Sequence, residues 1–351
     1  GYTCMKRILL LSLVLVFSLC ACTKQSRQPP EPTVQSLPSP LTLSAEEDAL
    51  MLCCEENRAL LAVGHRNGAQ EGPLYNTDYL LRWNYADGTS DKVPIQSQAY
   101  ITSAVFDKSD LLYVDYEAAD ARIAWSLIRC TEAEKTTLAS GQADSYDRVP
   151  ALFTLDKQPM YLLAEDSGLS VCRVDGSKVS TVLTVPDCTM PDPVTVCSNG
   201  TQYAFLAAVN GAAYGTVFIC DGSGILRQKE LSKPVTTFAI TDDYVVCGLG
   251  APDAGAFSYE SIPIGNGDVA TADSATPMWR LAGSGHSCLY VDGAFAPHIF
   301  YPNTQQTDTL TINTDTAAYQ NWPTLFFSDG AGGYLAQMDI DNTDYFWHIA
   351  A

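Results

Sequence analysis

The chain has 351 residues, of which 46% are hydrophobic and 17% are charged, and 40 acidic residues against 20 basic ones give a formal net charge of −20 at pH 7. The hydrophobic and aromatic content is sufficient for a large core. The excess of acid repels phosphate backbones and anionic lipid head groups, which argues against nucleic acid as a partner and against an electrostatic contact with a membrane. Cations and basic partners are compatible with this charge.

The first predicted element is a leader that begins at Met5. Lys6 and Arg7 directly precede the apolar run 8–21, and residues 1–4 are interpreted as an upstream artefact. The run is shorter than the ~20 residues that a helix needs to cross a bilayer, and its length is typical of a signal peptide. Residues 1–21 are therefore predicted to be a signal peptide and not a permanent anchor.

The residues Leu19-Cys20-Ala21-Cys22 resemble the lipobox of bacterial lipoproteins, in which an apolar, a variable and a small residue precede the modified cysteine. The resemblance implies that Cys22 receives a diacylglyceryl group and that cleavage follows Ala21. Two or three acyl chains anchor a protein durably, because each buried methylene contributes ~0.8 kcal/mol. The expected location is extracytoplasmic, lipid-anchored to the bacterial cell membrane, and the alternative is an ordinary secretory leader with chance cysteines. Cleavage would change the formal charge from −20 to −22, because Lys6 and Arg7 leave with the leader.

Residues 22–40 are predicted to be a semi-rigid tether. They contain Gln, Ser and Thr but no aromatic residue, and they carry five prolines, which are Pro29, Pro30, Pro32, Pro38 and Pro40. Such a composition cannot build a core and favours extended polyproline conformation. The folded domain is predicted to comprise residues 41–351.

This domain repeats one pattern, in which a short run rich in Val, Thr and aromatic residues meets a polar turn and resumes as a second apolar run. The pattern predicts β-hairpins, because Asp and Asn side chains accept hydrogen bonds from the turn backbone and tolerate tight backbone angles. Seven turns are assigned, at Asn57, Asp107, Asp156, Asn199, Asp242, Asp292 and Asp329. The steps from Asp107 to Asp242 are 49, 43 and 43 residues.

A period in the forties, with further strands such as 168–174 and 178–185 after the hairpin, predicts an all-β fold, a β-propeller of four-stranded blades. Seven blades are expected, and six to eight are compatible with the spacing. The last repeat supplies about three strands, so a strand from the amino-terminal side, placed at residues 41–44, is expected to complete it and cover its edge. The signatures of the WD and kelch families are missing at consistent positions, so no propeller family is assigned.

Two local features are interpreted within this frame. Ser44 and Glu47 fit a capping box, which predicts one helical turn. Residues 250–276 are rich in Gly, Ala, Asp and Ser. They are interpreted as an insertion between strands of the fifth blade and as a candidate binding loop.

Nine cysteines follow Cys22, and most stand inside strand-like runs, where free cysteine packs as a small apolar residue. Their odd number and even spread do not suggest a disulfide framework, although Cys188 and Cys197 are the best candidate pair. No C-x-x-C pair is available for structural zinc.

No catalytic or cofactor-binding residue is assigned. Ser287 lies in "GHSCL", which lacks the second glycine of a nucleophile elbow, and is interpreted as a strand residue. The segment "DIDNTDYF" clusters Asp339, Asp341 and Asp344, whose carboxylates can bind a hard cation such as Ca²⁺, although clustered aspartates also form ordinary turns.

The preferred interpretation of function is a membrane-tethered binding or scaffold module for a protein, a peptide or a glycan. A propeller offers a rigid face with loops, and the sequence shows no catalytic signature. The alternative is a carbohydrate-active enzyme whose carboxylates converge on the central channel, an arrangement that sequence spacing cannot reveal.

Overall fold

The computed structural model describes residues 29–68, 73–191, 193–209, 211–250, 255–312, 325–340 and 343–351. The chain divides into two compact units, Gly1–Glu31 and Pro32–Ala351. In the first unit only residues 29–31 are described, and they contain no helix or strand. Within the described ranges, no helix has the length and apolar character needed to span a membrane.

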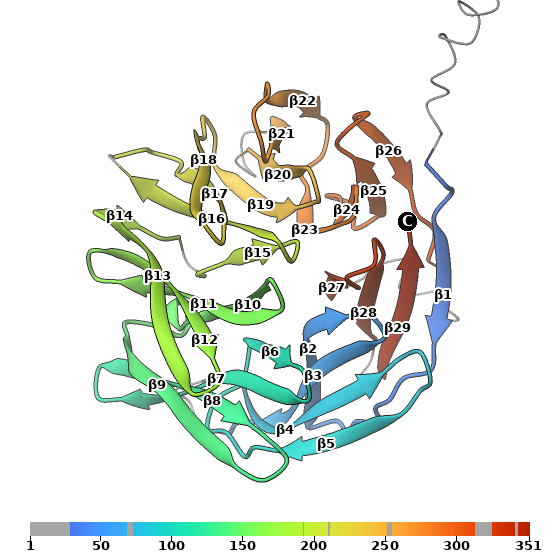
Figure 1. Ribbon diagram of the computed structural model, residues 1–351. Coiled ribbons are helices and arrows are strands. Elements are labelled where there is room, and N and C mark those ends of the chain that lie inside the picture. Colours follow the sequence, from blue (N-terminus) through green and yellow to red (C-terminus); the bar gives the residue numbers. More distant parts are fainter. Residues whose placement is uncertain are drawn as a thin grey trace, which may run out of the picture. The chain divides into compact units, whose positions relative to one another are not determined.

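The second unit is a ring of seven antiparallel sheets, each forming one blade whose strands are counted from the centre outward (Figure 1). Blade 1 contains β2 (Glu47–Glu55), β3 (Arg58–Arg66), β4 (Tyr75–Asn84) and β5 (Ser90–Pro94). Blade 2 contains β6 (Ala104–Asp107), β7 (Asp110–Ala119), β8 (Arg122–Cys130) and β9 (Lys135–Ala143). After the short 3-10 helix η1 (Tyr146–Arg148), blade 3 contains β10 (Ala151–Leu155), β11 (Gln158–Glu165), β12 (Gly168–Asp175) and β13 (Lys178–Pro186).

The remaining blades follow the same order. Blade 4 contains β15 (Val196–Ser198), β16 (Gln202–Val209), β17 (Thr216–Asp221) and β18 (Gly224–Glu230), with β14 (Cys188–Thr189) paired to the far end of β16. Blade 5 contains β19 (Val235–Ile240), β20 (Tyr244–Leu249), β21 (Phe257–Pro263) and β22 (Ala270–Ser274). Blade 6 contains β23 (Trp279–Ser284), β24 (Ser287–Val291), β25 (Pro297–Tyr301) and β26 (Gln306–Thr309). Blade 7 contains β27 (Leu325–Ser328), β28 (Tyr334–Ile340), β29 (Thr343–Ala350) and β1 (Thr33–Leu37).

The all-β, seven-bladed propeller predicted from the sequence is confirmed. Six of the seven assigned turns join the first two strands of a blade, but the assignment of Asp292 is wrong, because this residue follows β24. The hairpin of blade 6 turns instead at Gly285 and His286. Gly285 has a φ of +57°, in the left-handed region that glycine adopts without steric cost. The turn therefore forms without the Asp or Asn side chain on which the sequence pattern depended.

Two further local predictions are wrong. Residues 250–276 are not an insertion, because they include β21 and β22, the two outer strands of blade 5, while residues 251–254 lie outside the described part. Ser44 begins a turn and not a helix. Its N–H donates to Glu47 Oε1 at 3.0 Å, and the Glu47 N–H donates to the Ser44 carbonyl at 3.1 Å. One hydrogen bond of a capping box thus forms here, but no helix follows it, because the residues after the turn form β2 and pair with β3.

The ring closes through the amino-terminal strand β1, which pairs with β29 from Thr33 opposite Ala350 to Leu37 opposite Phe346. Closure from this side was predicted, but its placement at residues 41–44 is wrong, since these form no strand. The closing strand lies inside the stretch 22–40 that was interpreted as a tether. Pro32 and Pro38 flank the strand without interrupting it, which is compatible with their missing N–H donors.

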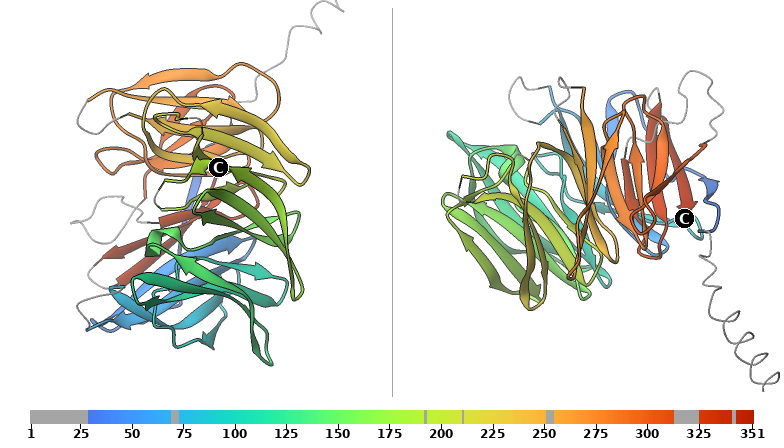
Figure 2. Two further views of the ribbon diagram at one scale, coloured as in Figure 1. Left: turned by 90° about the vertical axis from the view of Figure 1, so that its left-hand side faces the viewer. Right: turned by 90° about the horizontal axis from the view of Figure 1, so that it is seen from above.

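The two faces of the ring carry different connections. We call the face with the turns between first and second strands the hairpin face, and the opposite face, with the connections between second and third strands and between blades, the loop face. Figure 2 shows the ring edge-on in its right view. Because Thr33 pairs with Ala350 at the end of β29, β1 enters the propeller at the hairpin face and runs toward the loop face.

The core lies between neighbouring blades. Between blades 7 and 1, the buried side chains of Met51, Trp83, Leu335 and Phe346 form one cluster. The rings of Trp83 and Phe346 meet edge to face with centroids 4.9 Å apart, a favoured aromatic geometry. The first and last blades are therefore joined by side-chain packing as well as by the closing strand.

Hydrogen bonds between neighbouring inner strands reproduce the sequence period. Ser198 Oγ donates to the Thr154 carbonyl at 2.7 Å, and Ser328 Oγ donates to Ser284 Oγ at 2.7 Å. In both pairs the residues are 44 positions apart in the chain. The period seen in the sequence is thus the number of residues between equivalent positions in the inner strands of neighbouring blades.

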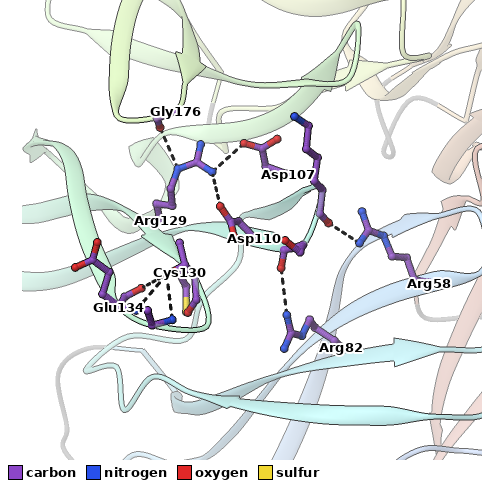
Figure 3. A network of polar contacts seen from close by, with 12 residues as sticks. Arg58, Arg82, Asp107, Asp110, Arg129, Cys130, Glu134 and Gly176 are labelled. Carbon is purple, nitrogen blue, oxygen red and sulfur yellow. Dashed lines mark hydrogen bonds and ion pairs between the residues drawn. The ribbon is translucent and has the colours of Figure 1, made fainter.

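Arginines tie the first three blades together at the hairpin face (Figure 3). Arg129 Nη1 lies 2.9 Å from Asp107 Oδ2 and 3.1 Å from Asp110 Oδ2, and its Nε donates to the Gly176 carbonyl of blade 3 at 3.0 Å. Its side chain is only 11% exposed, so this ion pair is shielded from solvent. Arg58 of blade 1 adds a bond from Nη1 to the Lys108 carbonyl of blade 2 at 2.7 Å. The two aspartates of the first hairpin of blade 2, Asp107 and Asp110, are thus both paired with Arg129.

Candidate functional site

Three aspartates gather on the loop face between blades 7 and 1, and we call Asp48, Asp339 and Asp344 the acidic seam. Asp48 stands near the start of β2, while Asp339 and Asp344 lie directly opposite each other where β28 and β29 meet. Residues opposed in an antiparallel ladder have Cβ atoms ~4.5–5.5 Å apart on one side of the sheet, and like charges there repel. The register therefore concentrates negative charge at this point.

Gln337 fixes Asp344 against blade 1. Its Nε2 donates to Asp344 Oδ1 at 2.8 Å and to the Ala49 carbonyl at 3.2 Å. Its Oε1 accepts the Met51 N–H at 3.1 Å. A glutamine that satisfies two backbone groups of the neighbouring blade is held in one orientation, so Asp344 Oδ1 is positioned by the closure of the ring.

Asp344 is buried, and only one of its two carboxyl oxygens accepts a hydrogen bond from a described residue. The residue is 4% exposed, and its Oδ2 has no hydrogen-bond partner among the described residues. Burial raises the pKa of Asp344 to about 7, the bond from Gln337 opposes this rise, and the charges of Asp339 and Asp48 add to it. Burial, and secondarily the charge of Asp339, also raises the pKa of Asp48. A strongly shifted carboxyl with identified charge neighbours is a functional-site candidate.

Tyr100 borders the acidic seam from the connection between β5 and β6. Its hydroxyl is buried and has no hydrogen-bond partner in the described part of the chain. Burial raises the pKa of Tyr100, and the charges of Asp48 and Asp344 raise it further. The ring of Tyr75 lies 5.5 Å from that of Tyr100, and the Arg66 guanidinium lies 5.7 Å from the Tyr75 centroid. Tyr100 is thus a second buried oxygen beside the three carboxyls.

The structure brings together two of the three residues proposed to bind calcium. Asp339 and Asp344 are cross-strand partners, whereas Asp341 lies outside the described residues. Among the residues that the structure describes, no group of three or more His, Cys, Asp or Glu side chains is placed to hold a metal ion. Calcium binding therefore stays a prediction, and so does the lipidation of Cys22, which also lies outside the described ranges.

The inner strands bear on the carbohydrate-active alternative, which needs two carboxyls facing each other across the channel. The inner strands of blades 3 to 7, which are β10, β15, β19, β23 and β27, contain no Asp or Glu. In β2 and β6 the acidic residues stand at the strand ends. Within these strands the carboxylates lie at the two faces and not midway along the channel, so this alternative gains no support from them.

The remaining reactive side chains have structural surroundings. Ser287 is a buried residue of β24, as expected, and its hydroxyl lies 2.9 Å from the hydroxyl of Tyr334. The nine described cysteines are free thiols, including the candidate pair Cys188 and Cys197. Burial raises the pKa of Cys220 to about 12, which keeps this thiol protonated and poorly nucleophilic.

Each of the four histidines instead pairs with an aspartate. The N–O separations are 2.8 Å for His65 and Asp78, 3.2 Å for His286 and Asp243, 2.7 Å for His298 and Asp292, and 2.7 Å for His348 and Asp329. The Ser287 hydroxyl contacts the Ser284 carbonyl and the Tyr334 hydroxyl, and among the described hydrogen bonds none joins it to a histidine.

Sequence reasoning found Asp339 and Asp344 by their spacing but missed Asp48, Gln337 and Tyr100. Asp48 stands in a run of three acids, residues 46–48, and no local signal connects it with a residue almost three hundred positions later. The contact exists because the ring places the first inner strand beside the last blade.

No family model matches the chain, and no curated protein matches it. Similar solved structures include a catalytically inactive virginiamycin B lyase from Staphylococcus aureus with quinupristin, at 12% identity and a TM-score of 0.54 over 92% of this chain and 100% of that one. YCF48 bound to D1 peptide has 11% identity and a TM-score of 0.52 over 90% of this chain and 100% of that one. A prolyl endopeptidase has 13% identity and a TM-score of 0.54 over 84% of this chain and 47% of that one.

These likenesses establish the propeller fold and no activity, because enzymes and a peptide-bound protein share it at such low identity. The chain is therefore a seven-bladed β-propeller, a fold that is compatible with a binding role.

Proposed function

We propose that the protein is a lipid-anchored extracytoplasmic binding module that engages a protein or peptide through its loop face. The observation that carries the proposal is the acidic seam, where Asp344 Oδ2 and the Tyr100 hydroxyl are buried without partners. Buried polar atoms without partners cost ~1–3 kcal/mol each, and a bound ligand that supplies donors would remove this cost. The peptide-bound propeller among the similar structures supports the proposal by analogy of fold alone.

The anchor is proposed from the lipobox-like residues that end at Cys22. The strand β1 begins at Thr33, so ten residues, 23–32, separate it from Cys22. Ten residues span at most ~35 Å when fully extended, so a lipid at Cys22 would keep the propeller close to the membrane surface. Because β1 begins at the hairpin face, the chain that leads to Cys22 would leave the propeller there, and a partner in the envelope would then have access to the loop face.

The anchor is tested by fractionating cells that express the full chain. We expect the wild type in the membrane fraction, labelled by a fatty-acid analogue, and the Cys22→Ser variant in the soluble extracytoplasmic fraction without label. Cys20→Ser is the matched control, because this cysteine would be discarded with the leader and its replacement should change nothing. Lipid labelling of Cys22→Ser would contradict the assignment.

The binding face is tested by placing a photo-crosslinking amino acid at exposed positions of both faces in the native envelope. Gln98 and Asp166 represent the loop face, and Ser177 and Ser223 the hairpin face. We expect specific protein crosslinks from the first two positions and none from the other two. The opposite pattern would contradict the proposal. Turnover of an oligosaccharide by the purified protein would favour the carbohydrate-active alternative instead.

A further inference from the structure

The acidic seam and the neighbouring Tyr100 each contain an oxygen that nothing in the described part of the chain satisfies. Asp344 is 4% exposed, and its Oδ2 accepts no hydrogen bond. The Tyr100 hydroxyl is likewise buried without a partner. Of the other two carboxylates, Asp48 is half-buried and Asp339 is exposed, so the group extends from buried positions to the solvent. This arrangement is distinct from an ordinary acidic turn, whose carboxylates are satisfied by backbone N–H groups or by water.

Neither Asp48 nor Asp344 forms an ion pair with any residue that the structure describes. The guanidinium of Arg66 lies over the ring of Tyr75. By contrast, Asp107 and Asp110 in blade 2 are paired with Arg129 (Figure 3).

A guanidinium group matches these requirements. It is planar, permanently charged and carries five N–H donors in a fixed fork, so it can bond one carboxylate in a bidentate manner and a second acceptor at the same time. It is also more weakly hydrated than an ammonium group, which lowers the cost of burying it, and its plane can stack on an aromatic ring such as that of Tyr100.

We propose that the acidic seam binds the guanidinium group of an arginine side chain presented by a protein partner, with Asp344 and Tyr100 as buried acceptors and Asp48 and Asp339 as the more exposed carboxylates. That the arginine belongs to a protein partner rests on the proposed function. That the site recognises a guanidinium group rests on the acidic seam alone. The binding surface is therefore selective for donor-rich cations over neutral peptides and glycans.

Proton linkage gives the site a second measurable property. Burial raises the pKa of Asp344 to about 7, and a bound cation favours its ionised form. The groups that face it are Gln337 and Asp339 of blade 7, Asp48 of blade 1 and the hydroxyl of Tyr100. Binding should therefore strengthen as the pH rises from 6 to 8, while an exposed surface carboxylate, ionised throughout this range, would show no such change.

The test titrates the purified chain, residues 22–351, with the blocked tripeptide acetyl-Gly-Arg-Gly-amide and monitors binding by NMR. The matched ligand replaces arginine by citrulline, which keeps the shape and removes the charge. We expect one site, at least tenfold tighter binding of the arginine peptide, and loss of this preference in Asp344→Asn. Asp273→Asn, which removes a charge from the exposed edge of blade 5, should bind as the wild type does.

Equal affinities for the two peptides, or an unchanged preference in Asp344→Asn, would overturn the proposal. A lysine peptide that binds tighter than the arginine peptide would replace guanidinium by ammonium and also overturn it. Saturable binding of Ca²⁺ alone with no peptide effect would overturn it in favour of the calcium prediction. If arginine binds the seam but no crosslink forms from the loop face in cells, the proposed function fails while this inference stands.

Discussion

Replacing Asp344 by asparagine is expected to raise the free energy of unfolding at pH 8 by about 2–4 kcal/mol. Asparagine keeps an oxygen that accepts the bond from Gln337, and it removes the charge that burial and Asp339 disfavour. The pKa of Asp344 is about 7 in the folded protein against 3.8 for the free group. A shift of this size is equivalent to roughly 4 kcal/mol when the carboxyl is fully ionised.

The sign of the pH dependence follows from proton binding. Between pH 4 and pH 7 the folded protein retains on Asp344 a proton that the unfolded chain has lost. Stability therefore falls as the pH rises through this window and levels off above it. The advantage of Asp344→Asn over the wild type should grow by roughly 2–3 kcal/mol from pH 5 to pH 8. Urea denaturation at both values measures it, with Asp273→Asn as the control for net charge.

A difference between Asp344→Asn and the wild type that is the same at pH 5 and pH 8 would show that Asp344 is ionised in the folded protein throughout this range. The variant also links stability with binding. If Asp344 lowers stability but is needed to bind a cation, the Asp344→Asn variant should gain stability and lose arginine binding at the same time. Such a trade-off between stability and function is common at functional sites.

The second large effect is expected from the closing strand. Removing residues 1–37 should lower the free energy of unfolding by about 2–4 kcal/mol relative to removing residues 1–31. The shorter deletion leaves β1 intact, while the longer one removes five residues of ladder and the half-buried side chains of Val34 and Leu37. It also exposes the edge of β29, and a free strand edge promotes aggregation.

Urea denaturation and size-exclusion chromatography of the two truncated chains measure both consequences. A pair of point variants separates the strand's side chains from its backbone. Val34→Asp places a charge against the core between blades 6 and 7 and should destabilise, whereas Gln35→Asp on the exposed side of the same strand should be nearly neutral. Equal stabilities of the two truncated chains would mean that β1 does not close the ring in solution.

The sequence by itself determined the repeating unit, because hairpin formation depends on local chemistry. Asp156 and Asn199 supply the turn, and the apolar runs beside them supply the strands. The same reasoning failed at Gly285, where a positive φ replaces an Asp or Asn side chain, and at residues 250–276, where polar composition concealed β21 and β22. β22 buries no residue fully, and three of the four buried residues of β21 are the polar Ser258, Glu260 and Ser261, so neither strand shows a clear hydrophobic pattern.

Tertiary structure alone decided which amino-terminal segment closes the ring and which acids meet. Thr33–Leu37 becomes a strand because β29 offers an open edge, a partner some three hundred residues away that no local pattern reveals. Likewise, Asp339 and Asp344 face each other across two strands of one hairpin, but only the closed ring sets Asp48 beside them and buries Asp344. Residue types determine which ionisable groups a chain carries. The burial and the proximity of these groups determine their pKa values and their affinity for a ligand, and both arise only when the ring is complete.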